Sequence, residues 1–310
     1  MTASPWALPA FAVGKRPYSW DDVAAFARRD GRWQQLVREV HEGLACRKAG
    51  HAAEPAAVKQ AAVDFRYRRR LITGEETEAW LRVRHVEVGE WMDCMRRAVL
   101  RADHPGIGST EAVAYDEVEP LLWATGRCRG LLDDFAVALA HRVAAHMRLT
   151  DSLPATDDDI DSALDRFRAT VVTAATVREE VARRQLDWLA VAREEARFAT
   201  DDAAREAVLS VRDDGLTLSE VCELAEVPLV RRTTLLEEVD EPLRPSVLGA
   251  RPGELVGPLP VEGGFAVALV ESKVVPSVDD PDIRRRAAEA TVAAALRREV
   301  EARVQWHDGH

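Results

Sequence analysis

The feature that most constrains the fold of this chain is a change of sequence pattern near Asp187. Before that residue, apolar side chains recur at the spacing of amphipathic helices, and residues 20–185 predict helices without an intervening strand. After it, stretches rich in β-branched residues alternate with two helical stretches, at 201–212 and 217–225. The sequence therefore predicts an α+β protein in which a mostly helical module is joined to a small α+β domain.

Two motifs in the helical part of the sequence mark the N-termini of helices. Ser19 with Asp22, and Thr73 with Glu76, predict capping boxes, because both side chains of each pair can accept backbone N–H groups. The expected helices cover roughly 20–29, 31–48, 56–70, 73–84, 88–101, 114–127, 129–149 and 159–185. The first eighteen residues are interrupted by three prolines and predict an irregular arm without a helix.

The small domain is expected to be built around strands at 196–200, 230–236 and 255–270. The last of these stretches predicts two strands joined at Gly263-Gly264, because glycine accepts the positive φ of a tight turn. A helix at 282–304 would expose its apolar stripe if it stood alone, so we expect it to return to the helical module. The predicted domains are 1–186, 187–281 and 282–310.

Composition limits the classes of partner. Lys and Arg number 42 against 53 Asp and Glu, and the resulting net charge of −11 repels phosphate backbones and anionic lipid. Charged residues interrupt every apolar stretch before it reaches the length of a membrane span. Neither nucleic acid nor a membrane is therefore an expected partner. The first residues lack a basic segment followed by an apolar one, which favours a cytoplasmic location.

Metal and cofactor motifs are not expected. The four cysteines, at 46, 94, 128 and 222, are widely spaced, as is typical of isolated thiols in a reducing compartment. His141 and His146 are five residues apart, unlike the i, i+4 pair of a zinc-binding helix, and predict two helix-surface histidines. The sequence contains no Walker-type phosphate loop, dinucleotide fingerprint or G-x-S-x-G motif.

Two further patterns have both a structural and a functional interpretation. The basic cluster Phe65-Arg-Tyr-Arg-Arg-Arg70 could bind an acidic peptide or RNA, but its arginines fan around a helix and many acidic side chains can pair with them, which favours ion pairs. The eight tryptophans favour helix–helix packing, with a minority available for an apolar peptide groove.

Residues 248–270, LGARPGELVGPLPVEGGFAVALV, resemble the closing signature of the parvulin-type peptidyl-prolyl isomerases and of the SurA-like chaperones that carry them. In that signature a Pro-Gly-Glu turn leads to a Gly-Pro strand, a glycine, an aromatic residue and a final strand. The helices at 201–212 and 217–225 are similar to the family in order and length, and 64–81 with 88–97 resembles the helical module that precedes the isomerase. The resemblance implies a parvulin-like domain inserted into a helical module.

The resemblance also implies two pocket histidines, and both are absent. Family members usually place one in the first strand and one directly after the aromatic residue of the last strand, where this chain has Ala196-Arg-Phe198 and Ala266. Proline isomerisation needs no acid–base group, only a pocket that favours the twisted amide, so the loss of both histidines weakens activity without proving its absence. We expect weak or no activity and assign no catalytic residue. The peptide-binding residues that the resemblance implies are Phe198, Leu248, Pro258, Phe265 and Ala266.

The expected function is that of a chaperone-like protein with a degenerate parvulin domain, and its expected partner is a peptide or an unfolded polypeptide. A cytoplasmic branch of such proteins, found beside enzymes that mature ribosomally made peptides, fits the missing histidines and implies a precursor peptide or its modifying enzyme as partner. The alternatives are an active, histidine-independent prolyl isomerase and a non-catalytic scaffold protein.

Overall fold

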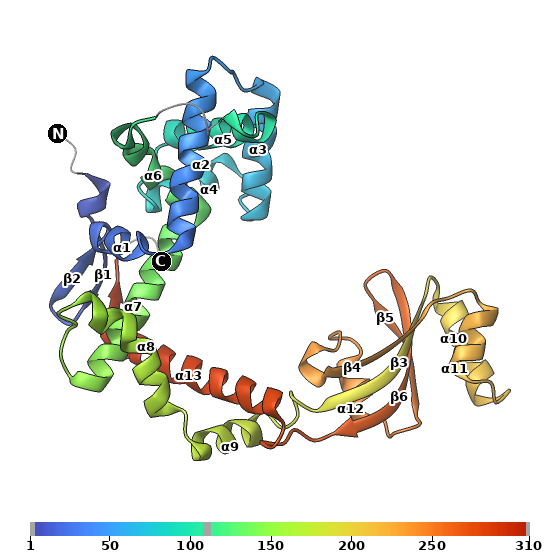
Figure 1. The fold of residues 1–310 in the computed structure, drawn as a ribbon. Coiled ribbons are helices and arrows are strands. Elements are labelled where there is room, and N and C mark those ends of the chain that lie inside the picture. The colour runs from blue at the N-terminus through green and yellow to red at the C-terminus, as the bar shows by residue number, and fades with distance from the viewer. Residues whose placement is uncertain (1–3, 108–112, 308–310) are drawn as a thin grey trace. The chain divides into compact units, whose positions relative to one another are not determined.

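The computed structural model describes residues 4–107 and 113–307, and the chain folds into two compact units (Figure 1). Unit 1 comprises Met1–Arg168 and Ala295–His310, and unit 2 comprises Ala169–Ala294. The domain boundaries predicted after residues 186 and 281 are not decided by this division, because two helices each run across a limit between the units. The mixture of helices with antiparallel sheets confirms the predicted α+β class.

Unit 1 combines helices with a small antiparallel sheet of strand order β2-β1-β7. The strands are β1 (Pro9–Val13), β2 (Arg16–Ser19) and β7 (Val304–Trp306). The helices are η1 (Pro5–Ala7), α1 (Trp20–Ala27), α2 (Gly31–Lys48), α3 (Pro55–Arg68), α4 (Gly74–Val83), α5 (Val88–Asp103), α6 (Tyr115–Arg129), α7 (Leu131–Thr150) and α8 (Asp157–Val171). Both predicted capping boxes, at Ser19 and Thr73, are present.

The irregular arm predicted for the first eighteen residues is wrong for residues 4–18, which form η1 and most of the hairpin of β1 and β2, whereas residues 1–3 lie outside the described part of the chain. The prolines do not prevent pairing: Pro9 is the first residue of β1, and Pro17 lies in β2, which is an edge strand. Proline is tolerated at both kinds of position because no ladder hydrogen bond is lost there. Strand β7, near the end of the chain, pairs with the other side of β1.

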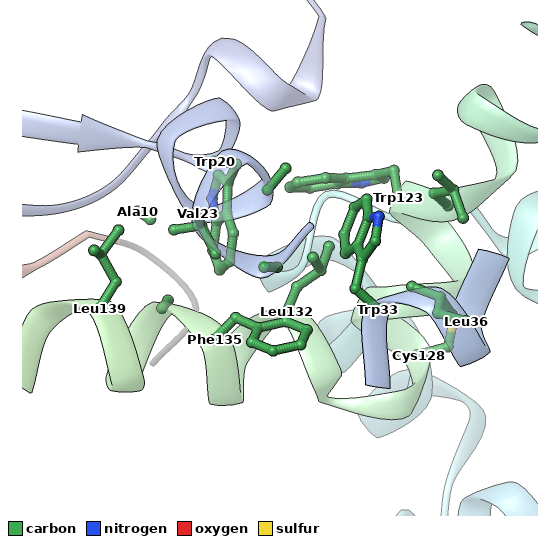
Figure 2. Packing of buried hydrophobic residues seen from close by; sticks show 14 of the residues in the cluster. Ala10, Trp20, Val23, Trp33, Leu36, Trp123, Cys128, Leu132, Phe135 and Leu139 are labelled. Carbon is green, nitrogen blue, oxygen red and sulfur yellow. The ribbon is translucent and has the colours of Figure 1, made fainter. Parts of the chain in front are cut away.

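Aromatic side chains fill the core of unit 1. Trp20, Trp33 and Trp123 are buried with Leu132 and Phe135 of α7 (Figure 2). The rings of Trp20 and Trp123 meet edge to face with their centroids 5.6 Å apart. All eight tryptophans are buried or half-buried in the cores of their units, which confirms the packing role predicted for them.

Unit 2 contains a four-stranded antiparallel sheet of order β4-β3-β6-β5. The strands are β3 (Ala190–Phe198), β4 (Leu229–Leu235), β5 (Leu255–Val261) and β6 (Gly264–Val274). The helices are α9 (Ala174–Arg183), α10 (Asp201–Arg212), α11 (Leu218–Leu224), η3 (Leu236–Glu238), α12 (Arg244–Gly249) and the first part of α13 (Pro281–Arg303). The predicted hairpin at Gly263-Gly264 is confirmed.

Three secondary-structure predictions need correction. The long helix expected at 159–185 is divided, because Thr173 caps a new helix by accepting the backbone N–H of Thr176. Strand β3 begins at Ala190, six residues before the predicted start, since its first part is rich in charged side chains that concealed the strand pattern. Helix α12 was not expected at all.

Helix α13 contributes to the cores of both units. Ile283 and Ala287, near its start, pack with Val177 of α9 and with Trp188 in unit 2. Val300, near its end, lies in the core of unit 1 together with β7. None of the helices in the described part of the chain is both long enough and apolar enough to cross a membrane.

Candidate functional site

The sheet of unit 2 separates two apolar clusters, one on each face. On one face, side chains of β3, β5 and β6 pack against α10 and α11, and on the other they pack against η3 and α12. Phe198 and Phe265 are paired across β3 and β6 and belong to the cluster on the α10–α11 face. Ala266, the next residue of β6, belongs to the cluster on the α12 face because successive side chains of a strand point to opposite faces.

The sequence-predicted binding residues are therefore not all brought together. Phe198 and Phe265 lie side by side on one face, and Ala266 lies on the other. Leu248 is 38% exposed on α12, and its backbone carbonyl accepts a hydrogen bond from Nζ of Lys273 at 2.7 Å. Pro258 is half-buried in β5, after a cis peptide bond to Gly257.

A groove lies between α10 and α11, on the face that holds Phe198. Its volume is about 320 Å³. The lining is mostly apolar and consists of Phe198, Ala203, Glu206, Ala207, Ser210, Leu216, Val221, Leu224 and Ala225. Leu224 is 77% exposed. The groove can therefore bury an apolar side chain of another molecule between the two helices.

Charged residues occupy the other face of β3. Arg197 and Glu195 are paired across β3 and β6 with Ala266 and Ala268, so they share the face that those alanines occupy. The Nε of Arg193 donates to Oε2 of Glu195 at 3.1 Å, and the Nη2 of Arg197 donates to Oε1 of Glu195 at 3.2 Å. Both oxygens of the Glu195 carboxylate are thus used.

Two further groups complete this network. The Nη1 of Arg193 donates to Oγ1 of Thr234 at 2.7 Å, and the Nη2 of Arg197 donates to Oδ2 of Asp240 at 2.5 Å. The side chains of Arg193 and Glu195 are each only 2% exposed. A buried carboxylate between two guanidinium groups is part of the structure, because both of its oxygens accept hydrogen bonds from side chains of the same strand.

The position at which the resemblance implies the second histidine lies in a packed apolar cluster. Ala266 is fully buried, in a cluster that includes Val247 and Val256. Arg197 lies across from it in the neighbouring strand. Long charged side chains thus share the face with the alanine methyl groups. The signal in the sequence is a charged residue at every second position, Arg193, Glu195 and Arg197, which is the spacing of one face of a strand.

Two predictions about polar side chains in unit 1 also need correction. His146 was expected on a helix surface but is 4% exposed, within the packed side of α7. The ion pairs favoured for the arginines at 66–70 are absent from the described residues, where no carboxylate lies within ion-pair distance of these guanidinium groups. In residues 4–107 and 113–307, no group of three or more His, Cys, Asp or Glu side chains could hold a metal ion.

No protein-family model and no curated protein matches the sequence. Solved structures do match. The peptidylprolyl isomerase PrsA from Bacillus cereus is 10% identical, with 96% of this chain and 91% of that chain covered and a TM-score of 0.28. The foldase protein PrsA from Streptococcus pneumoniae is 9% identical, with 95% and 93% covered and a TM-score of 0.29.

A structure of SurA-like chaperones from Campylobacter jejuni is 15% identical, with 61% of this chain and 82% of that chain covered and a TM-score of 0.26. These proteins are of the class that the sequence resembles. At such identities and TM-scores the likeness does not assign a site or an activity to this chain, because function depends on the side chains at a site.

Proposed function

We propose that the protein is a chaperone-like protein that binds extended segments of polypeptide, and that its parvulin-like unit serves binding and not efficient isomerisation. The observation that carries the proposal is the apolar groove between α10 and α11, lined by Phe198 from the sheet and by the exposed Leu224. A groove of this size accommodates one or two apolar side chains of an extended peptide.

The other face of the sheet supports the second part of the proposal. A prolyl isomerase must offer a pocket in which the twisted amide is more stable than the planar one. Here Ala266 is fully buried, and the polar groups opposite it are engaged with one another through Glu195. The hydrogen-bonding groups of this face are therefore used within the protein.

The partner that we propose is a ribosomally made precursor peptide, or the enzyme that modifies it, in the cytoplasm. Support for this finer assignment comes from the sequence resemblance and from the two missing histidines. An extended precursor would offer the apolar side chains that the groove can bury.

Isothermal titration with an extended peptide that carries leucine or phenylalanine tests the proposal. Leu224→Glu is expected to weaken binding by about tenfold or more, because burying a leucine stabilises a complex by about 1.5–3 kcal/mol. The matched control is Leu209→Glu, at an exposed leucine of α10 that does not line the groove. Binding should also show a negative heat-capacity change.

An equal loss of peptide affinity in Leu224→Glu and Leu209→Glu would show that the groove is not the binding site. No binding by the unmodified protein at millimolar peptide would favour a scaffold role.

A further inference from the structure

Unit 1 contains a cavity that the groove of unit 2 does not involve. It has a volume of about 360 Å³ and is lined by side chains of α2, α3, α5 and α6, and by Arg69 directly after α3. One carboxylate, that of Glu39, lines it. Five guanidinium groups also line it, those of Arg68, Arg69, Arg97, Arg101 and Arg129. The cavity is therefore strongly basic although the chain as a whole is acidic.

Three of these arginines have an acidic partner. Arg101 pairs with Glu39 at 2.7 Å, and Arg129 pairs with the same carboxylate. Arg97, which is buried, pairs with Asp93 one turn earlier in α5. The carboxylates of Glu39 and Asp93 are therefore engaged in ion pairs with these three guanidinium groups.

Arg68 and Arg69 are different because the acceptors recorded for them are backbone carbonyls. The Nε of Arg68 donates to the carbonyl oxygen of Asp64 at 3.3 Å, and Arg69 donates to the carbonyl oxygen of Cys128. In the described segments, no carboxylate lies within 4.0 Å of either guanidinium group. Arg69 is half-buried over the ring of Phe65, with 4.0 Å between its Cζ and the ring centroid. Burial lowers the pKa of this guanidinium.

A half-buried guanidinium group without an acid is costly, because carbonyl groups compensate its lost hydration only in part. A carboxylate that entered the cavity would supply the missing charge and could accept two parallel N–H bonds from the arginine fork. The ring of Phe65 would form an apolar wall beside it. The cavity holds a group the size of a side chain, whereas the net charge of −11 disfavours a long polyanion.

We propose that this cavity binds a carboxylate of an acidic polypeptide segment, with Arg69 and Arg68 as the residues that receive it. The carboxylate can belong to an Asp or Glu side chain or to a free C-terminus. The proposal rests on the proposed function to the extent that the ligand is a polypeptide. The cavity would bind a charged group of the polypeptide, whereas the groove of unit 2 would bind its apolar side chains.

The test uses three fluorescent peptides of one sequence and the full-length protein. The first has glutamates and a free C-terminus, the second has the same glutamates and an amidated C-terminus, and the third has glutamines and an amidated C-terminus. We expect the third to bind at least about tenfold more weakly than the first, and all differences to shrink at high salt. The second peptide shows which carboxylate is bound.

Arg69→Gln is expected to bring the first peptide to the affinity of the third. The matched control is Arg70→Gln, which removes the same charge from an exposed neighbour that does not line the cavity, and it should change affinity less than twofold. Arg68→Gln, at an exposed side chain, provides a second variant that retains the fold and should weaken binding several-fold.

Equal losses in Arg69→Gln and Arg70→Gln would show a general charge effect and overturn the proposal. Equal affinity for the glutamate and glutamine peptides would also overturn it. Stronger competition by inorganic phosphate than by the acidic peptide would reassign the site to phosphate. These variants lie in unit 1, so their failure is distinguishable from failure of the Leu224→Glu test in unit 2.

Discussion

The arginine side chains of the two units are paired in different ways. In unit 2, Arg193 and Arg197 share the carboxylate of Glu195, and Arg197 also reaches Asp240. In unit 1, Arg68 and Arg69 donate to backbone carbonyls. A buried charge that is fully paired is part of the structure, whereas a half-buried guanidinium group without an acid is available to a ligand.

The difference does not arise from a shortage of acidic residues in unit 1. Arg127, which is fully buried in the same unit, pairs with Asp133 and lies over the ring of Trp20. In unit 2 the pairing follows from strand geometry, because residues two apart in β3 share a face. In unit 1 the cavity arginines come from several helices, and the acids that reach them are Glu39 and Asp93.

The largest expected effect is on stability and concerns Glu195. Glu195→Gln removes the negative charge between Arg193 and Arg197, and we expect it to lower the free energy of unfolding by about 3–5 kcal/mol. Chemical denaturation measures the change. The matched control is Glu271→Gln, at an exposed glutamate of β6, which should stay within about 0.5 kcal/mol.

Arg69→Gln in unit 1 is the counterpart of Glu195→Gln in unit 2, because it removes a charge without leaving a buried carboxylate unpaired. It should lower the free energy of unfolding much less than Glu195→Gln does. A loss for Glu195→Gln no larger than that of Glu271→Gln would contradict a structural role for the network.

A smaller effect distinguishes Cys94, which lines the arginine-rich cavity of unit 1, from Cys222 of unit 2. The hydrogen bond from Cys128, aided by the nearby Arg97, lowers the pKa of Cys94 to about 7, whereas burial raises the pKa of Cys222. Because thiolate is the reactive form, iodoacetamide at pH 7 should alkylate Cys94 at least about tenfold faster than Cys222. The Cys94 rate should rise from pH 6 to pH 8 and then level off as the thiolate becomes fully formed.

Mass spectrometry of the labelled peptides measures both rates in one sample. Cys128→Ala removes the thiol that donates to Cys94, so it should slow alkylation of Cys94 at pH 7 and shift the rise to higher pH. Equal rates for Cys94 and Cys222 in the unchanged protein would show that the cavity does not activate its thiol.

Much of the fold could be predicted because local signals agree with it. The capping residues Ser19 and Thr73 mark helix starts, and Gly263-Gly264 marks the hairpin of unit 2. The hairpin of β1 and β2 could not be predicted, because β1 also pairs with β7, almost three hundred residues further along the chain. Local sequence does not report such long-range pairing.

The candidate sites were less predictable than the fold. The family resemblance predicts Phe198 as a binding residue. The groove that Phe198 lines also includes Leu224, whose exposure is a property of the folded protein and cannot be predicted from the sequence. The role of Glu195 depends on which face of β3 it occupies, and this follows from the register with β6. That Arg69 donates to a backbone carbonyl and not to a carboxylate is a tertiary property, because the sequence does not show which side chains lie near it in the fold.

On the α12 face of unit 2 a charge network lies beside a packed apolar cluster, and we propose that the protein binds peptide without efficient isomerisation. Refolding of a protein limited by a prolyl bond tests this most directly, because the uncatalysed step takes tens to hundreds of seconds. We expect catalytic amounts of the full-length protein to leave the slow phase unchanged within error. Acceleration comparable to that of an ordinary parvulin would show instead that the protein is a histidine-independent isomerase.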